Sequence, residues 1–352
     1  MKIAIVTDTH FGARNDSQLF LDHFSDFFRE QFFPTLKKYD ITTVIHGGDL
    51  LDRRKYVNFN TLACVRESFM EPLKKMGVTT HCILGNHDTY YKNTNDLNSI
   101  RELFSDRYDN FITYEEPTTV NFDGFEMALL PWINKENYDS SIEFINSTTA
   151  QWLFGHLELE GYEVLKGIKY DGGMDPSIFN RFEQVVSGHF HNRQERGNII
   201  YLGSPYQMTF SDVNDTKGFW ILDTDTRELE FIPNKNKMFY NLSYDDENND
   251  YSKFISKKHS KYKDSYVKLY VINKNEPHIL DRVIDSLYNS GVYDLTVVEE
   301  ELEDYDSESE DSSTDMTKST LELILEEVDK VCEDPKRVKN LVQEIYMESL
   351  KS

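Results

Sequence analysis

Short apolar runs that end at Gly, Asp, Asn or His alternate with helix-like segments from Met1 to about Asn234. Runs of three to five apolar residues bounded by turn residues are typical of buried strands, whereas apolar residues spaced three to four apart indicate helices. The expected strands are Ile3–Val6, Thr42–His46, His81–Leu84, Trp152–Phe154 and Gln184–Val186, and the expected helices are Asp16–Lys38 and Asn60–Met76. This alternation predicts a layered α/β domain.

Further strands are expected later in this region. Val120–Trp132 has Asp-Gly between two apolar runs, which is typical of a β-hairpin. Asn198–Ser204 and Gly218–Thr224 are also apolar, and we expect both to extend a second sheet.

A smaller unit is expected after the Pro-Asn-Lys-Asn break at 233–236. Its strand Tyr266–Ile272, helix Pro277–Ser290 and strand Val292–Val298 form a β-α-β pattern. Glu299–Asp315 then holds ten acidic residues and no basic one, so this segment cannot bury a core and is expected to be a disordered linker. The predicted domains are therefore 1–236, 237–298, a linker at 299–316 and a last unit at 317–352.

The last unit is expected to be a helical hairpin, because apolar residues recur there at helical spacing on two successive segments. Two helices after a flexible tether have little to bury by themselves, so we interpret the hairpin as a docking element for a partner. The alternative is that it folds back on the main domain. The expected partner-binding residues are Leu321, Leu325, Val328, Leu341 and Ile345.

The charge of the chain restricts its partners. Thirty-eight Lys and Arg against 62 Asp and Glu give 352 residues a formal net charge of −24, so the whole-chain field should repel DNA, RNA and anionic lipid. Any contact with nucleic acid must then be local. Three distant cysteines fit a reducing compartment. Because we find neither a membrane span nor a signal-peptide core, we expect a soluble cytoplasmic protein with no membrane partner.

Polar clusters follow the five expected core strands. They are Asp8-Thr9-His10, Gly48-Asp49 with Asp52, Gly85-Asn86-His87-Asp88, Gly155-His156 and Gly188-His189-Phe190-His191. Ligands of open α/β sheets bind at the carboxyl ends of the strands, so five such ends in one place predict a metal site. Carboxylate, imidazole and amide donors without thiolate fit Mn, Fe or Zn better than Mg alone. Seven candidate ligands exceed the need of one ion, which indicates two ions bridged by a carboxylate.

These clusters, written DTH, GDxxD, GNHD, GH and GHFH, resemble the signature of the calcineurin-like binuclear metallophosphoesterases. The continuation YLGSPYQ, the appendage and the tethered helices resemble the SbcD branch, DNA nucleases that work with an SMC-like ATPase of the SbcC type. The stretch PTTVNFDGF is most similar to the nuclease subunits of T-even-like phage recombination endonucleases. The resemblance implies an α/β fold of four layers, with two sheets flanked by helices, a small α+β capping domain and the C-terminal hairpin.

The resemblance also implies roles for individual residues. One ion would be held by Asp8, His10 and His191, the other by Asn86, His156 and His189, with Asp49 as the bridging ligand. His87 would not be a ligand but would face the scissile phosphate, with the carboxylate of Asp52 orienting it. Some nuclease branches place His where this chain has Asp52, and phosphatases place Asp there.

Two basic segments are candidate DNA contacts. Arg53, Arg54 and Lys55 follow the metal loop, and a lysine group containing Lys257, Lys258 and Lys261 precedes the appendage. The alternative for each segment is a solvated surface. Two other residues are expected to be structural: His46 as a hydrogen-bonded core histidine, and Asp88 as a partner of the backbone in its turn.

The sequence thus predicts a metal-dependent DNA phosphodiesterase, with exonuclease or endonuclease action, that works with an SMC-like ATPase in recombination and break processing. Two divalent ions, Mn in the first place and otherwise Mg, Fe or Zn, would serve it. A homodimer is also compatible with the resemblance, and a phage-encoded protein would act in the host cytoplasm. The alternatives are a phosphomonoesterase acting on protein or small-molecule phosphates, and a scaffold with dead chemistry, which would have lost ligands.

Overall fold

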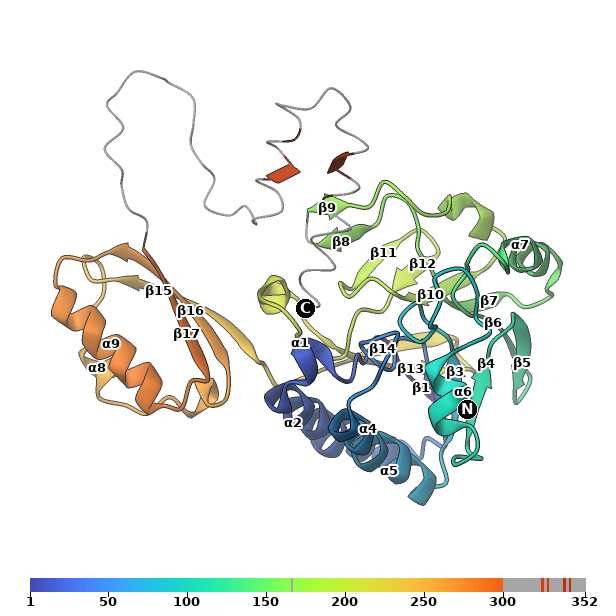
Figure 1. The fold of residues 1–352 in the computed structure, drawn as a ribbon, viewed down its shortest axis with the longest axis horizontal. Coiled ribbons are helices and arrows are strands. Elements are labelled where there is room, and N and C mark those ends of the chain that lie inside the picture. The colour runs from blue at the N-terminus through green and yellow to red at the C-terminus, as the bar shows by residue number, and fades with distance from the viewer. Residues whose placement is uncertain (166, 300–323, 326–327, 329–337, 340–341, 343–352) are drawn as a thin grey trace. The chain divides into compact units, whose positions relative to one another are not determined.

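The computed structural model describes residues 1–165, 167–299, 324–325, 328, 338–339 and 342. The chain divides into two compact units, Met1–Asn236 and a second one beginning at Lys237. The division falls at the Pro-Asn-Lys-Asn break that the sequence predicts. Figure 1 shows the elements of both units, and the following paragraphs describe each unit by itself.

The first sheet of the larger unit contains the amino-terminal strands. In spatial order it consists of β14 (Glu228–Pro233), β13 (Gly218–Asp223), β1 (Lys2–Val6), β2 (Thr43–His46), β3 (Thr79–Ile83) and β4 (Phe111–Tyr114). Strands β1 to β4 are parallel, and β13 pairs antiparallel with β1. The expectation that Gly218–Thr224 extends the second sheet is therefore wrong. Trp220 lies opposite Ile5 instead, because a buried apolar strand can satisfy either sheet.

The second sheet repeats this arrangement. Its order is β11 (Gln194–Arg196), β12 (Ile199–Tyr201), β10 (Gln184–Gly188), β7 (Trp152–His156), β6 (Phe125–Leu130) and β5 (Thr118–Phe122). The four strands β12, β10, β7 and β6 are parallel, and β5 and β6 form the predicted hairpin around Asp123-Gly124. A separate two-stranded ribbon joins β8 (Glu163–Leu165) to β9 (Ile168–Lys169).

The two long helices expected from the sequence each contain a π-helical segment. The first is built from α2 (Gln18–Phe27), η1 (Phe28–Phe32) and α3 (Phe33–Lys38), and the second from α4 (Phe59–Val65), η2 (Arg66–Met70) and α5 (Glu71–Lys75). Pro34 and Pro72 lie in the first turn after each π segment. Proline lacks an N–H and its ring displaces a carbonyl of the preceding turn, which a π segment can accommodate.

The remaining helices of this unit are short. They are α1 (Ala13–Asp16), α6 (Ser99–Phe104), α7 (Tyr138–Ser147), η3 (Pro176–Phe179) and η4 (Phe210–Asn214). Inside α1, Arg14 and Asn15 have left-handed backbone angles, so this element is a pair of turns rather than a regular helix.

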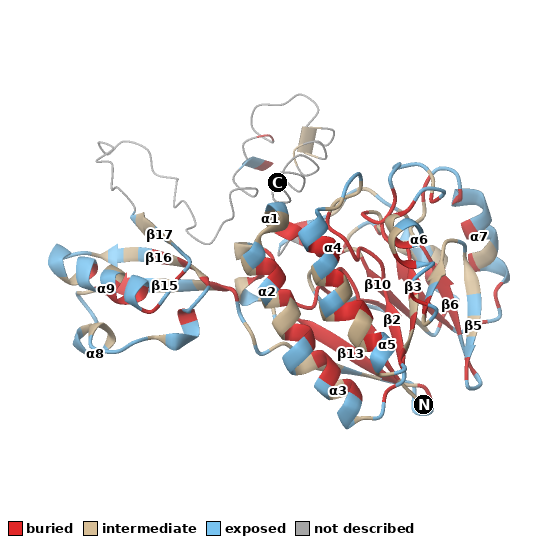
Figure 2. Ribbon diagram, turned by 60° about the horizontal axis from the view of Figure 1, so that its bottom comes forward, coloured by how far each residue is buried: buried red, intermediate tan, exposed pale blue. Residues whose placement is uncertain are grey.

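The core of the larger unit lies between the two sheets. Ile3, Ile45 and Ile83 of the first sheet pack in one buried cluster with Phe154 and Val186 of the second. Figure 2 shows these central strands as buried, with helices outside them. The arrangement of helices, sheet, sheet and helix confirms the expected four-layer α/β sandwich.

The second unit has one strand more than the predicted β-α-β pattern. Its elements are β15 (Phe239–Asp245), α8 (Ser252–Ile255), η5 (Ser260–Tyr262), β16 (Tyr266–Asn273), α9 (Pro277–Asn289) and β17 (Asp294–Glu299). The three strands form a parallel sheet in the order β15-β16-β17. Val267, Leu269, Leu280, Val283 and Leu287 form its core, because α9 buries one apolar face against the sheet.

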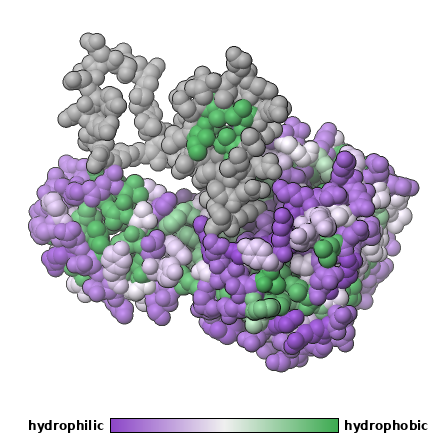
Figure 3. All heavy atoms as spheres, in the orientation of Figure 1, coloured by the Kyte–Doolittle hydropathy of each residue, from purple (hydrophilic) through white to green (hydrophobic). Residues whose placement is uncertain are grey.

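Most of the predicted linker and hairpin lies outside the described residues, including Leu321, Leu341 and Ile345. Glu299, the expected first residue of the linker, is instead the last residue of β17. Leu325 and Val328 are helical and buried. Within the described ranges, no helix has the length and apolar character needed to cross a bilayer. The described surface seen in Figure 3 is largely hydrophilic and carries only limited apolar patches.

Candidate metal centre

The candidate ligands come together where the two sheets meet. Asp8 and His10 follow β1, Asp49 follows β2 and Asn86 follows β3, all in the first sheet, whereas His156 ends β7 in the second. His189 and His191, which follow β10, also come from the second sheet. The polar strand ends converge as predicted, but they come from both sheets of the sandwich rather than from a single sheet.

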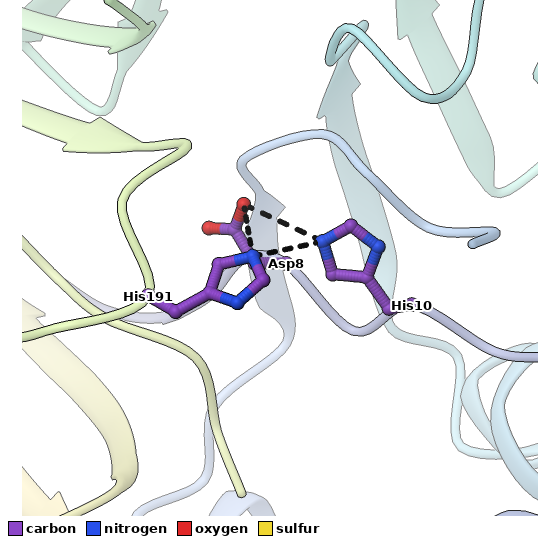
Figure 4. A group of neighbouring side chains, drawn as sticks. All are labelled: Asp8, His10 and His191. Atoms are coloured by element: carbon purple, nitrogen blue, oxygen red, sulfur yellow. Dashed lines mark hydrogen bonds and ion pairs between the residues drawn. The ribbon is translucent and has the colours of Figure 1, made fainter. Parts of the chain in front are cut away.

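Asp8, His10 and His191 form the first group (Figure 4). The Nε2 atoms of His10 and His191 lie 3.1 Å apart, and each lies 4.0 Å from Oδ1 of Asp8. Two imidazole nitrogens at this distance repel each other unless a proton or a cation lies between them. One carboxylate and two imidazoles facing one point suit a divalent transition-metal ion.

Asn86, His156 and His189 form the second group. The side-chain oxygen of Asn86 lies 3.0 Å from Nε2 of His156 and 3.0 Å from Nδ1 of His189. The opposite nitrogen of His156, Nδ1, lies 2.8 Å from the carbonyl oxygen of Gly47. A carbonyl partner on the far side of the ring fixes its tautomer and directs Nε2 toward the centre.

Asp49 lies between the two groups. Its Oδ2 is 3.5 Å from Nε2 of His10 and 3.5 Å from Nε2 of His156, and its Oδ1 accepts a hydrogen bond of 2.7 Å from the backbone N–H of His87. Burial raises the pKa of Asp49, but the charges of His156, His87 and His10 outweigh it and hold this pKa well below its usual range. A carboxylate that stays ionised in this position suits a bridging ligand.

The backbone at the ligands is strained. Asp8, His10, Asp49 and His189 have φ angles of 53°, 41°, 55° and 88°, a region that costs a non-glycine residue about 1–3 kcal/mol. Gly85 provides room for this arrangement, because a Cβ atom there would lie 2.1 Å from Oδ1 of Asp49. Strain concentrated at one cluster is typical of functional sites.

Asp52 contacts two histidines of the site. Its carboxylate Oδ1 lies 3.3 Å from Nδ1 of His10, and its backbone carbonyl lies 2.5 Å from Nδ1 of His87. The carboxylate therefore orients a candidate ligand, in the arrangement common behind metal-binding histidines. Burial lowers the pKa of His10. The hydrogen bond to Asp52 and the charges of the nearby carboxylates raise this pKa by more than burial lowers it, so the net shift is upward.

His87 is buried next to the first group. Its ring lies 4.9 Å from the ring of His10, and one nitrogen of His87, one of His10 and one oxygen of Asp49 lie within 4.8 Å of one another. His87 is thus close enough to act on a substrate held at the first group. The geometry is also compatible with direct ligation, which metal analysis of a His87 variant distinguishes.

Lys217 is a component of the site that sequence reasoning missed. Its Nζ donates a hydrogen bond of 2.6 Å to the carbonyl oxygen of His191 and forms ion pairs of 2.8 and 2.9 Å with Asp212 and Asp215. Burial lowers the pKa of Lys217, but the two carboxylates outweigh it and raise the pKa. A charged lysine thus holds the backbone at a candidate ligand. In the sequence, the close spacing of Asp212, Asp215 and Lys217 is the feature that could have indicated this ion-pair network.

Two arginines of the first basic segment contact other parts of the chain, whereas the candidate lysines of the second segment are exposed. Arg53 pairs with Asp16 and Arg54 donates to the backbone of Thr89, so neither extends freely into solvent. Lys55 is exposed. The second segment lies in the second unit, where its three candidate lysines are all exposed: Lys257, Lys258 and Lys261.

The two residues expected to be structural behave as predicted. His46 is buried, with Nε2 3.1 Å from the hydroxyl of Thr9 and Nδ1 accepting from the backbone of Gly48. Asp88 accepts hydrogen bonds of 2.7 to 3.0 Å from the backbone N–H groups of Asp49, Leu50 and Gly85. It therefore ties the loop after β3 to the loop after β2.

Comparisons with known proteins agree with this geometry. A model of the calcineurin-like phosphoesterase family matches residues 1–193. Exonuclease subunit 1 of Enterobacteria phage T4 is 38% identical over 244 residues, 69% of this chain and 71% of that protein. The SbcD component of nuclease SbcCD from Staphylococcus epidermidis is 26% identical (67% and 70% covered), and the DNA double-strand break repair protein Mre11 of Nanoarchaeum equitans is 23% identical (66% and 68% covered). The chain belongs to the calcineurin-like phosphoesterase family.

Proposed function

We propose that the protein is a metal-dependent DNA nuclease that hydrolyses phosphodiester bonds. The observation that carries this proposal is the buried cluster of carboxylate, imidazole and amide donors at the carboxyl ends of strands from both sheets. The names of the relatives, an exonuclease subunit and a nuclease subunit, support DNA as the substrate.

The donor set suits two divalent ions, and Mn²⁺ in the first place. Asp8, His10 and His191 would hold one ion, Asn86, His156 and His189 the other, and Asp49 would bridge them. Such ions polarise a phosphate oxygen and lower the pKa of a bound water, so that a nucleophile is available at neutral pH. The protein contributes a rigid arrangement of donors, because each loop that bears them is fixed by buried hydrogen bonds.

His87 is proposed to act on the phosphate and the leaving oxygen. Its Nδ1 donates to the carbonyl of Asp52, which leaves Nε2 as the nitrogen that exchanges a proton with the substrate. From there His87 would stabilise the charge that develops on phosphate or protonate the leaving sugar oxygen. Asp52 would act through two histidines: its carbonyl positions His87, and its carboxylate positions His10.

The relatives are named as subunits, which supports a partner protein. We propose an SMC-like ATPase of the SbcC type as that partner, docked through the C-terminal segment. Lys257, Lys258 and Lys261 of the second unit would contact the DNA backbone. Similarity to a phage protein supports action in the cytoplasm of an infected host.

The decisive experiment offers the pure protein two substrates in the presence of Mn²⁺: linear duplex DNA and a generic aryl phosphomonoester. We expect hydrolysis of the DNA, its abolition by chelator, and its loss in Asp49→Asn, which removes one charge from the proposed bridging ligand. Cleavage of the phosphomonoester alone would refute the proposal in favour of a phosphatase. Inactivity of the Mn²⁺-loaded protein on both substrates would refute any hydrolytic role.

A further inference from the structure

A groove lies beside the metal centre, between the loop after β2 and the loop after β3. Its volume is about 180 Å³, comparable to that of cavities of about 150 Å³ that bind benzene, so it suits an organic ring rather than a single ion. Its walls come from residues 51–57 and 90–103. The first wall includes Arg53, the neighbour of Asp52, and the second begins three residues after His87. The groove therefore adjoins the residues of the proposed chemistry along the chain.

The groove is braced from both sides. The guanidinium of Arg54 donates to the carbonyl and the hydroxyl of Thr89, both at 3.0 Å, and to the carbonyl of Tyr91 at 3.1 Å, so it ties the two walls together. Arg53 is held by an ion pair of 3.0 Å to Asp16 and lies 4.9 Å from the centre of the Tyr56 ring. Walls held in this way need little ordering when a ligand enters, which lowers the entropic cost of binding.

The lining combines aromatic faces with positive charge. Tyr56 is 64% exposed and Tyr90 36% exposed, and both line the groove. Lys55 is exposed and forms no ion pair with any described residue. Aromatic faces stack bases, and cations neutralise phosphates.

Resting on the nuclease function proposed above, we propose that this groove holds one unpaired nucleotide of the substrate strand. Its base lies against Tyr56 and Tyr90, and its phosphate lies at Lys55. A base inside a duplex has both faces covered by its neighbours and must leave the stack to enter such a groove. The protein therefore binds single strands and frayed ends more tightly than blunt, fully paired DNA.

The test compares binding of two labelled probes to the full-length, Mn²⁺-loaded protein by fluorescence anisotropy. One probe is a short oligothymidylate and the other a blunt hairpin duplex, both with phosphorothioate linkages that resist hydrolysis. Tyr56→Ala/Tyr90→Ala should weaken binding of the single strand about tenfold or more, because the loss of one stacked base commonly costs about fivefold or more. Tyr56→Phe/Tyr90→Phe should retain binding, since it keeps both rings.

Tyr138→Ala is the matched control, because Tyr138 is 47% exposed but lies on α7, outside the groove. It should bind both probes like the unmodified protein. Unchanged single-strand binding by the double alanine variant, or an equal loss on both probes, would overturn the proposal. If the double alanine variant does not fold, the single variant Tyr56→Ala, at the more exposed position, tests the proposal by the same comparison of the two probes. Failure of the unmodified protein to cleave any DNA would instead overturn the nuclease function itself.

Discussion

Replacing Lys217 by methionine should weaken both the fold and the metal centre. Methionine has a side chain of similar length but carries no charge, so the change removes the ammonium group from two carboxylates and from the carbonyl of His191. Lys217 is 3% exposed, and Asp212 and Asp215 are 5% and 23% exposed. Breaking a buried ion pair by removing one partner costs about 3–5 kcal/mol. Because Asp215 is reached by water, we expect the lower end, about 3 kcal/mol.

The change should also weaken binding of the proposed ions, because Lys217 would no longer hold the backbone carbonyl of His191. Mutation of groups behind metal ligands commonly costs about 10- to 100-fold in metal affinity. Urea denaturation with chelator measures the first effect, and calorimetric titration with Mn²⁺ measures the second. Lys217→Met/Asp215→Asn should recover part of the stability, since it removes one of the two uncompensated carboxylates.

Lys2→Met is the control, because Lys2 pairs with Asp223 at 3.2 Å but is 37% exposed. Surface pairs of this kind contribute little to stability. If Lys217→Met unfolds at the same urea concentration as this control and binds Mn²⁺ like the unmodified protein, the buried network has neither of the assigned effects.

Three further predictions concern the proposed function. His87→Ala should retain both ions in elemental analysis but lose about 10²–10³ in hydrolysis rate, as expected when one group that stabilises the transition state is removed; loss of an ion would instead make His87 a ligand. Truncation after residue 307 should leave a folded nuclease, with its thermal transition intact, that no longer binds the ATPase in a pull-down; precipitation would show that the removed segment belongs to the core. Replacing Lys257, Lys258 and Lys261 together by alanine should flatten the salt dependence of duplex binding by nearly one unit of log-log slope per lost phosphate contact, and an unaltered slope would make them a solvated surface.

Most of the candidate site could be predicted because its signal is local. Each ligand follows a parallel strand within a few residues, and parallel strands bring their carboxyl ends to one edge. The roles of Asp52 and Lys217 could not be found in this way. They depend on which atom of Asp52 faces which histidine, and on a contact between Lys217 and a residue 26 positions earlier. Local sequence does not determine such geometry.

The fold was predictable to a similar depth. Apolar runs identify the core strands, but an apolar run does not say which sheet it joins, so the sheet expected for Gly218–Thr224 is the wrong one. Strand β15 escapes prediction because its apolar and polar residues alternate weakly beside a loop rich in Asp and Asn. The π segments had a signal, since Pro34 and Pro72 interrupt otherwise regular helical patterns.

The position of the proposed ligands on two different sheets would link ion binding to the lifetime of the protein. Ions held jointly by Asp8 of one sheet and His191 of the other would fasten the two halves of the sandwich at their rim. A ligand that binds only the packed state adds about 2.7 kcal/mol of stability when its concentration is 100 times its Kd. Scarcity of the metal would then not merely idle the enzyme. It would also weaken the packing of the two sheets and make the protein more susceptible to proteolysis, so the cellular amount of the nuclease would depend on the supply of the ion.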